Sequence, residues 1–137
     1  MNLTIIDGQG GMLGAQLVRE ISASFPEIEI TAIGTNASAT AAMIKAGAKR
    51  AATGENPVIV ACRTADVIIG PIGIVIADSL FGEVTPSMAL AVAQANAMRI
   101  LIPMNKCDNV VAGVSDTSTS ALIGDAVARL GKIISEA

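Results

Sequence analysis

An apolar strand that runs into a glycine-rich turn, near the start of the chain, limits the folds open to this sequence more than any other feature. Residues 3–6 are apolar or β-branched, which predicts a short buried strand. A glycine turn and an apolar helical face follow. They consist of Gly8, Gly10, Gly11 and Gly14 for the turn and Leu13, Leu17, Val18 and Ile21 for the face. Strand, glycine turn and helix in this order present backbone N–H groups and a positive dipole end to an anion, usually a phosphate. The sequence therefore predicts an α/β fold with an anion-binding turn.

Strands and helices alternate along the rest of the chain. Further strands are predicted at residues 28–33, 50–52, 66–69 and 99–102, with a sixth at 109–113. One helix is predicted to begin after Asn36 or Ser38 and to end at Gly47, and a second follows Pro57 over residues 58–64. Two more are predicted at residues 85–97 and, as the closing helix, at 117–136. This alternation requires a parallel sheet with right-handed crossovers. We expect a Rossmann-like, three-layer doubly wound sheet in the order 3-2-1-4-5, with a flavodoxin-like order as the alternative, in one domain over residues 1–137.

Polar and glycine-rich turns follow the carboxyl ends of the predicted strands, whereas the opposite ends have plain connections such as residues 46–49. Ligands bind at the carboxyl edge of open α/β sheets, near the switch point between strands one and four, so these turns form the candidate site. Its predicted cofactor-binding residues are Asp7, Gly8, Gln9, Gly10, Gly11, Met12, Thr35, Asn36, Gly54, Glu55, Asn56, Gly70, Pro71, Ile72 and Gly73. A purely structural role of the same turns stays open, because tight turns need glycine in any α/β protein.

The ligand predicted for this edge is NAD or NADP, although two features depart from the usual site. The spacing Gly-x-Gly-x-x-x-Gly is one residue longer than the common dinucleotide fingerprint, and the Lys-Ser/Thr of a P-loop is missing. The position that closes the second strand offers Thr35 and Asn36 instead of the acidic residue that usually holds the adenosine ribose. Substitution of Gly11 by Val is expected to abolish nucleotide binding and to keep the fold largely intact.

Asp7 is the charged residue of the turn. Its carboxylate would repel a pyrophosphate unless a Mg²⁺ ion bridges the two groups or Lys106 pairs with it. We favour a structural role, in which Asp7 accepts the backbone N–H of Gly10 or Gly11.

Two known families resemble parts of the sequence. Residues 30–39 and the glycine turn at 8–11 resemble the second-strand region and the first phosphate loop of the tubulin-like cell-division GTPases, which makes a guanine nucleotide the alternative ligand. Residues 70–76 depart from the glycine- and threonine-rich loop of those GTPases. A closer resemblance covers nearly the whole chain. The motifs DGQGG, GTN, ATGEN, GPIGI and GEVTP look like those of an uncharacterised bacterial family of short domain-of-unknown-function proteins. That resemblance implies a Rossmann-like fold and no particular activity.

Composition argues against several classes of partner. The chain is 52% hydrophobic but holds only Phe25 and Phe81 as aromatic residues, so it lacks stacking platforms for bases. A net charge of −3 also argues against nucleic acid. The most apolar run, residues 67–80, is interrupted by glycine and proline and is too short to span a bilayer, and the start of the chain lacks the basic region of a signal peptide. Cys62 and Cys107 stand far apart without a CxxC motif, as expected of free thiols in the cytoplasm.

Catalytic residue types are sparse. The sequence holds no His, which excludes Ser-His, Cys-His and His-metal sites. Cys107 beside Lys106 is a candidate reactive thiolate, and Glu55 and Glu83 are the remaining acid or base candidates. Each has an ordinary alternative, as an idle thiol or a solvated carboxylate, and no spacing typical of metal ligands is present. We therefore expect a nucleotide-binding or sensing protein ahead of an enzyme, and a structural subunit without a small ligand as the third hypothesis.

Self-association is also predicted. Residues 72–81 contribute six large apolar side chains with little regular period, more than the interior of a small domain accommodates easily. A large exposed apolar patch usually marks an interface. We expect a homodimer or larger homo-oligomer with residues 72–85 at its contact. Faces of small residues on two helices support this expectation: Ala89, Ala93 and Ala97 on one, and Gly124, Ala128, Gly131 and Ser135 on the other.

Overall fold

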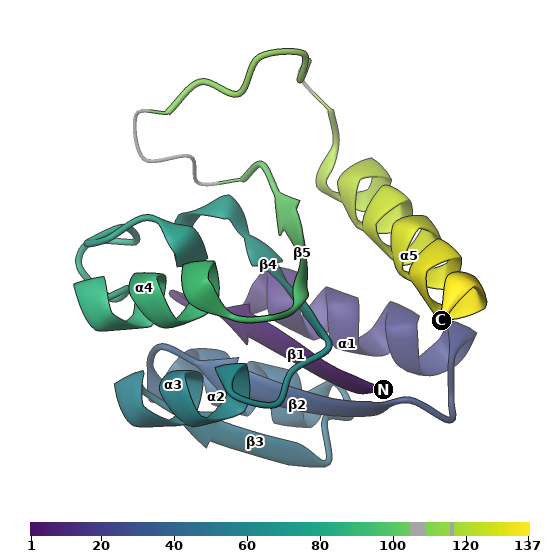
Figure 1. The fold of residues 1–137 in the computed structure, drawn as a ribbon, viewed down its shortest axis with the longest axis horizontal. Coiled ribbons are helices and arrows are strands. Elements are labelled where there is room, and N and C mark those ends of the chain that lie inside the picture. Colours follow the sequence, from purple (N-terminus) through teal and green to yellow (C-terminus); the bar gives the residue numbers. More distant parts are fainter. Residues whose placement is uncertain (105–108, 116) are drawn as a thin grey trace.

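Parallel strands form the central sheet of the structure, a computed structural model that describes residues 1–104, 109–115 and 117–137. The strands are β1 (Asn2–Asp7), β2 (Glu29–Gly34), β3 (Arg50–Thr53), β4 (Val67–Pro71) and β5 (Met98–Ile102). They lie in the order β3-β2-β1-β4-β5 (Figure 1). This order confirms the predicted doubly wound, Rossmann-like sheet and rules out the flavodoxin-like alternative.

Helices cover both faces of the sheet and complete the three layers. They are α1 (Met12–Ser24), α2 (Ala37–Lys45), α3 (Glu55–Cys62), the short 3-10 helix η1 (Ile72–Val75), α4 (Pro86–Gln94) and α5 (Thr119–Glu136). The first core lies between the sheet and α1, α2 and α5. The second core lies on the other face, beneath α3, α4 and η1.

Alternate side chains of β1 enter these two cores. Leu3 and Ile5 point into the first core, and Ile6 points into the second. In the sheet, Leu3 lies opposite Ile30 of β2, and Ile5 lies opposite Ile69 of β4. Because helices cover both faces, the central strands are almost continuous apolar runs, as buried parallel strands usually are.

The predicted starts of α2 and α4 are confirmed by their caps. The side chain of Asn36 accepts the N–H of Ala39 at 2.9 Å, and the side chain of Thr85 accepts the N–H of Met88 at 3.1 Å. Each cap satisfies one of the backbone donors that the first turn of a helix leaves without a partner.

Several predicted boundaries differ from the structure. α3 begins at Glu55, ahead of Pro57. The helix tolerates this proline because N–H groups in the first turn have no helical carbonyl to donate to, so the missing N–H of Pro57 breaks no hydrogen bond. α4 ends at Gln94 and not at residue 97. The guanidinium of Arg99 donates to the carbonyl of Ala95 at 2.8 Å and so occupies this helix end. The predicted sixth strand is wrong, because residues 109–113 form no strand.

The last helix, α5, begins after Ser118, whose side chain accepts the N–H of Ala121 at 3.2 Å. Its fully buried residues are Ile123, Ala126 and Leu130. Four further apolar residues of this helix are only half-buried: Leu122, Val127, Ile133 and Ile134. α5 rests on α1 and on the edge strand β5 (Figure 1). None of the helices in the described ranges is long and apolar enough to cross a membrane.

The segment after β4 folds inward. Ile74, Leu80 and Val84 are between 1% and 3% exposed and belong to the second core. The hydroxyl of Ser79 donates to the carbonyl of Gly73 within the segment. Of the six large apolar side chains of residues 72–81, Ile74 and Leu80 are thus buried, whereas Ile72, Val75 and Ile76 are half-buried. An interface at residues 72–85 stays a prediction. Phe81, at the tip, is 99% exposed.

Candidate functional site

The glycine turn between β1 and α1 is closed by a carboxylate of its own. Asp7 ends β1 and accepts the N–H of Gly8 at 2.8 Å and the N–H of Gly14 at 2.7 Å. Gly14 lies in the first turn of α1, so Asp7 caps this helix from the end of the strand. The prediction that Asp7 accepts backbone N–H groups of the turn is confirmed, but the donors are Gly8 and Gly14 and not Gly10 or Gly11.

Burial shapes the charge of Asp7. Only 5% of the residue is exposed. Burial raises the pKa of Asp7 above its ordinary value, the N–H groups of Gly14 and Gly8 lower it in part, and the nearby charge of Glu83 raises it further. Since Asp7 already takes up the inner side of the turn, an external anion can approach only from the outer side.

Gly10 and Gly11 differ sharply in their surroundings. Gly11 has a φ of 73°, and a Cβ on it would lie 2.6 Å from the Cα of Ala39 in α2. The expectation that Gly11→Val leaves the fold intact is therefore wrong, because the clash is with backbone. Gly10 is exposed, and a Cβ on it would meet only the Cγ of Met12, at 4.0 Å. The side chain of Met12 is itself 72% exposed.

A second carboxylate, from Glu83, lies over the same turn. Its Oε1 accepts the N–H of Gln9 at 2.8 Å, the hydroxyl of Thr35 at 2.8 Å and the side-chain amide of Asn36 at 2.6 Å. The amide of Asn36 also donates to the carbonyl of Gln9 at 3.0 Å. Through these bonds the connection between η1 and α4, which carries Glu83, lies against the ends of β1 and β2. The ends of β1 and β2 are thus joined through one oxygen atom.

These donors also control the ionisation of Glu83. Burial raises its pKa, but the hydrogen bonds from Gln9, Thr35 and Asn36 together bring the pKa below its ordinary value. From the sequence, Glu83 was predicted only as an acid or base candidate and was not placed at the glycine turn. The GEVTP motif, just before a predicted helix start, was the available signal.

The turn after β3 meets the site at its border. The N–H of Gly54 donates to the carbonyl of Gly34 at 2.9 Å, which ties this turn to the end of β2. Glu55 accepts the hydroxyl of Thr85 at 2.6 Å, so the start of α3 holds the segment that carries Glu83. Asn56 is exposed. Residues 54–56 therefore anchor the segment and do not themselves line the glycine turn.

Residues 70–73 have mainly structural roles. A Cβ on Gly70 would collide with the carbonyl oxygen of Ile6, so only glycine fits beside β1. Pro71 and Gly73 are buried, and Ile72 faces a different part of the molecule.

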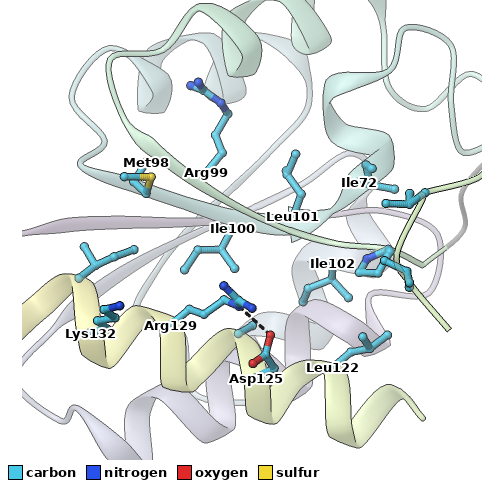
Figure 2. A pocket seen from close by; sticks show the side chains of 15 residues that line it. Ile72, Met98, Arg99, Ile100, Leu101, Ile102, Leu122, Asp125, Arg129 and Lys132 are labelled. Carbon is cyan, nitrogen blue, oxygen red and sulfur yellow. Dashed lines mark hydrogen bonds and ion pairs between the residues drawn. The ribbon is translucent and has the colours of Figure 1, made fainter. Parts of the chain in front are cut away.

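That other part is a cavity of about 530 Å³ between β5 and α5. Figure 2 shows Ile100 and Ile102 pointing from β5 toward α5, with Leu122 and Arg129 on the helix side. Arg129 donates to Asp125 at 2.7 Å at the rim. No local sequence pattern predicts this cavity, because the cavity depends on how far α5 covers the edge strand.

Catalytic and metal candidates add little to the site. Among the described residues, no cluster of three or more His, Cys, Asp or Glu could hold a metal ion. Cys62 is buried in the second core, and burial raises the pKa of its thiol, which the charge of Arg99 lowers in part. Lys106 and Cys107 lie outside the described residues.

Comparison with known proteins identifies a family without an assigned activity. The family described as "Domain of unknown function (DUF3842)" matches residues 2–135, and the chain belongs to it. The search of curated proteins gave no match. Among solved structures, the chain is similar to a dodecameric FMN-dependent UbiX-like decarboxylase from Escherichia coli O157:H7, with 16% identity and a TM-score of 0.44 over 98% of this chain and 94% of that one. A likeness of this degree assigns no ligand, activity or assembly to this chain.

Proposed function

We propose that this DUF3842 member binds a nicotinamide dinucleotide at the carboxyl edge of β1 and β2, prefers NAD to NADP, and serves in a binding or sensing role. The position of the Glu83 carboxylate carries the proposal. Dinucleotide sites usually place an acidic residue at the end of the second strand, where it accepts the hydroxyls of the adenosine ribose. Here Thr35 and Asn36 follow that strand directly, and both donate to Glu83. The segment after β4 thus supplies the acid that β2 lacks.

The bonding of Glu83 suits this role. All three donors reach Oε1, so Oε2 can accept from a ribose hydroxyl. The lowered pKa of Glu83 keeps the carboxylate ionised at neutral pH. A 2′-phosphate at the same place would meet this negative charge, which is the reason for the preference for NAD.

The outer side of the glycine turn suits the pyrophosphate. Gly10 is exposed at the N-terminal end of α1, where the helix dipole favours an anion. The absence of a side chain at Gly10 lets a phosphate approach the backbone. Asp7 lies on the inner side of the turn, where its carboxylate accepts the N–H groups of Gly8 and Gly14.

Titration with NAD, NADP, ATP and GTP, followed by thermal shift and calorimetry, tests the proposal. We expect NAD to bind about tenfold or more tightly than NADP, and NAD at a hundred times its Kd to stabilise the fold by about 2.7 kcal/mol. Glu83→Gln should remove most of the preference, because the charge that repels the 2′-phosphate is gone. Glu55→Gln is the matched control, since Glu55 also bonds the 83–85 segment but lies at the border. Gly10→Val should block binding with the fold intact.

Three outcomes would overturn the proposal. Equal affinity of the parent for NAD and NADP would remove the role of Glu83. Stabilisation by GTP without NAD would favour the guanine-nucleotide alternative. No effect of any of the four nucleotides would leave the structural subunit as the remaining hypothesis.

A further inference from the structure

The outer edge of β5 has no strand beside it in the described part of the chain. β5 is the last strand of the sheet and pairs with β4. The N–H of Met98 donates to the carbonyl of Asp66 at 3.0 Å, so Met98 and every second residue after it turn their backbone groups toward β4. Arg99 and Leu101 therefore turn their N–H and C=O groups outward. Such an edge is a template for another strand.

The cavity beside this edge is shaped for apolar side chains. It holds about 530 Å³ and is bounded by Ile100 and Ile102 of β5 and by Leu122 and Ile133 of α5. Figure 2 shows that Ile100 and Ile102 point to the side of α5, whereas Arg99 and Leu101 point to the opposite side. A strand added at the edge would direct every second side chain into this cavity.

We propose that a second copy of this chain occupies the edge, with the two β5 strands antiparallel and the two-fold axis at Ile100. In this register Arg99 lies opposite the partner's Leu101, and both residues have the outward backbone groups that such a pair exchanges. Ile100 lies opposite the partner's Ile100 and Met98 opposite the partner's Ile102, so the β5 side of the cavity is apolar throughout. The strand is self-complementary, as an interface on a two-fold axis must be.

Charges on α5 agree with this antiparallel arrangement. Asp125 lies near the Ile102 end of the cavity, and Lys132 lies near the Met98 end (Figure 2). Antiparallel pairing therefore brings Asp125 to the partner's Lys132, a match of opposite charge at each end. Arg129, between them, is already held by Asp125 of its own chain at 2.7 Å.

This contact differs from the one predicted at residues 72–85, of which Ile74, Leu80 and Val84 are buried in the second core. It also does not depend on the proposed nucleotide site, because β5 and α5 share no residue with the glycine turn.

Cysteine crosslinking tests the register directly. In a background with Cys62→Ala and Cys107→Ser, we expect Ile100→Cys to form an interchain disulfide on mild oxidation. Residues directly opposite in a non-hydrogen-bonded pair have Cα atoms about 4.5 Å apart, within the range of a disulfide. Met98→Cys alone should stay reduced, because the two sulfurs would lie four positions apart. A mixture of Met98→Cys and Ile102→Cys chains should crosslink.

Light scattering and sedimentation test the assembly itself. We expect a dimer in the parent at high micromolar concentration, and a dissociation constant raised about tenfold or more by Met98→Lys, because a lysine on an edge strand opposes pairing. Met98 is 58% exposed, so the variant should fold as the parent does, with an unchanged circular dichroism spectrum.

A monomeric parent would overturn the proposal and would leave the edge for a small apolar molecule or an extended peptide of another protein. A dimer in which Ile100→Cys stays reduced and Met98→Lys has no effect would also overturn it, because the contact would then lie elsewhere.

Discussion

At the glycine turn, three backbone N–H groups already donate to carboxylates of the chain itself, whereas along β5 the outward backbone groups have no partner in the described residues. Asp7 and Glu83 accept the N–H groups of Gly8, Gln9 and Gly14. Arg99 and Leu101 face outward beside an apolar cavity. Both places offer backbone donors at the margin of the same sheet, but carboxylates of the chain accept such donors only at the glycine turn.

The difference bears on what each place can bind. At the turn, a ligand must fit around charges that are already fixed, so shape and charge select it. At β5, a partner must supply both hydrogen-bond donors and acceptors along its length, which a strand does and a small molecule does not. The glycine turn is therefore suited to selecting a ligand, and the outer edge of β5 is suited to assembly.

The largest effect is expected from filling the tight side of the glycine turn. Gly11→Ala should lower the free energy of unfolding by about 3 kcal/mol, the combined cost of a left-handed alanine and an overpacked contact. A Cβ there would lie 2.6 Å from the Cα and 2.8 Å from the carbonyl oxygen of Ala39, neither of which can turn aside. Urea denaturation measures the loss.

Two matched variants sharpen this result. Gly10→Ala should change stability by about 0.5 kcal/mol or less, because the residue is exposed and has open space. Gly124→Ala, in the helix that flanks the open edge, should stabilise by about 1 kcal/mol, since nothing lies within 4 Å and alanine is the better helix former. A Gly11→Ala protein as stable as the parent would contradict the close packing of this turn.

Local pattern was enough to predict the sheet. The strands, their order and the caps at Asn36 and Thr85 follow from apolar runs and from cap residues, both of which act within a few positions. The predicted anion-facing edge follows from the sheet order. The ligand and most of the assigned binding residues remain predictions.

Local pattern failed where distant contacts decide. Glu83 reaches the N–H of Gln9 across 74 positions, and no short motif encodes that contact. The need for glycine at position 11 comes from the backbone of Ala39 in another helix. Residues 109–113 include the β-branched pair Val110 and Val111 but form no strand, because a strand also needs a partner in register. In each case the missing information lies outside the local sequence.

A smaller effect is expected when pH removes the charge of Glu83. Its pKa is lowered in the fold, so its contribution to stability is complete above the ordinary pKa of about 4.3 and is lost as pH falls through the folded value. At pH 7, Glu83→Gln should lower the free energy of unfolding by about 1 kcal/mol. The loss is smaller than for a fully buried carboxylate with the same hydrogen bonds, because solvent screens the exposed side of Glu83.

The measurement is the stability difference between parent and Glu83→Gln from neutral pH down to about pH 3. This difference should shrink at acid pH. The pKa of Asp7 is raised in the fold, so ionisation of Asp7 changes the free energy of unfolding in the opposite direction. This effect cancels in the comparison only if Asp7 titrates alike in the parent and in Glu83→Gln. Asp125→Asn at the exposed rim of the other edge is the control, and its difference from the parent should stay below about 0.5 kcal/mol. A Glu83→Gln difference that does not vary with pH would mean that the carboxylate is not held at the turn.

The smallest effect is a gain in stability at the tip of the segment that closes the turn. Asp78, Leu80 and Phe81 have φ values of 65°, 55° and 56°, which side chains other than glycine rarely adopt. The contacts of Glu83 and the burial of Leu80 hold this conformation, whereas Phe81 is 99% exposed and contributes no packing. Phe81→Gly should therefore stabilise the protein by about 0.5 kcal/mol, the relief of left-handed strain less the greater chain entropy of glycine. Phe81→Ala keeps the Cβ and should leave stability nearly unchanged, so the pair separates backbone strain from loss of the ring. If Phe81→Gly destabilises the protein in urea denaturation and Phe81→Ala does so equally, the ring contributes to stability and the segment is not strained at this residue.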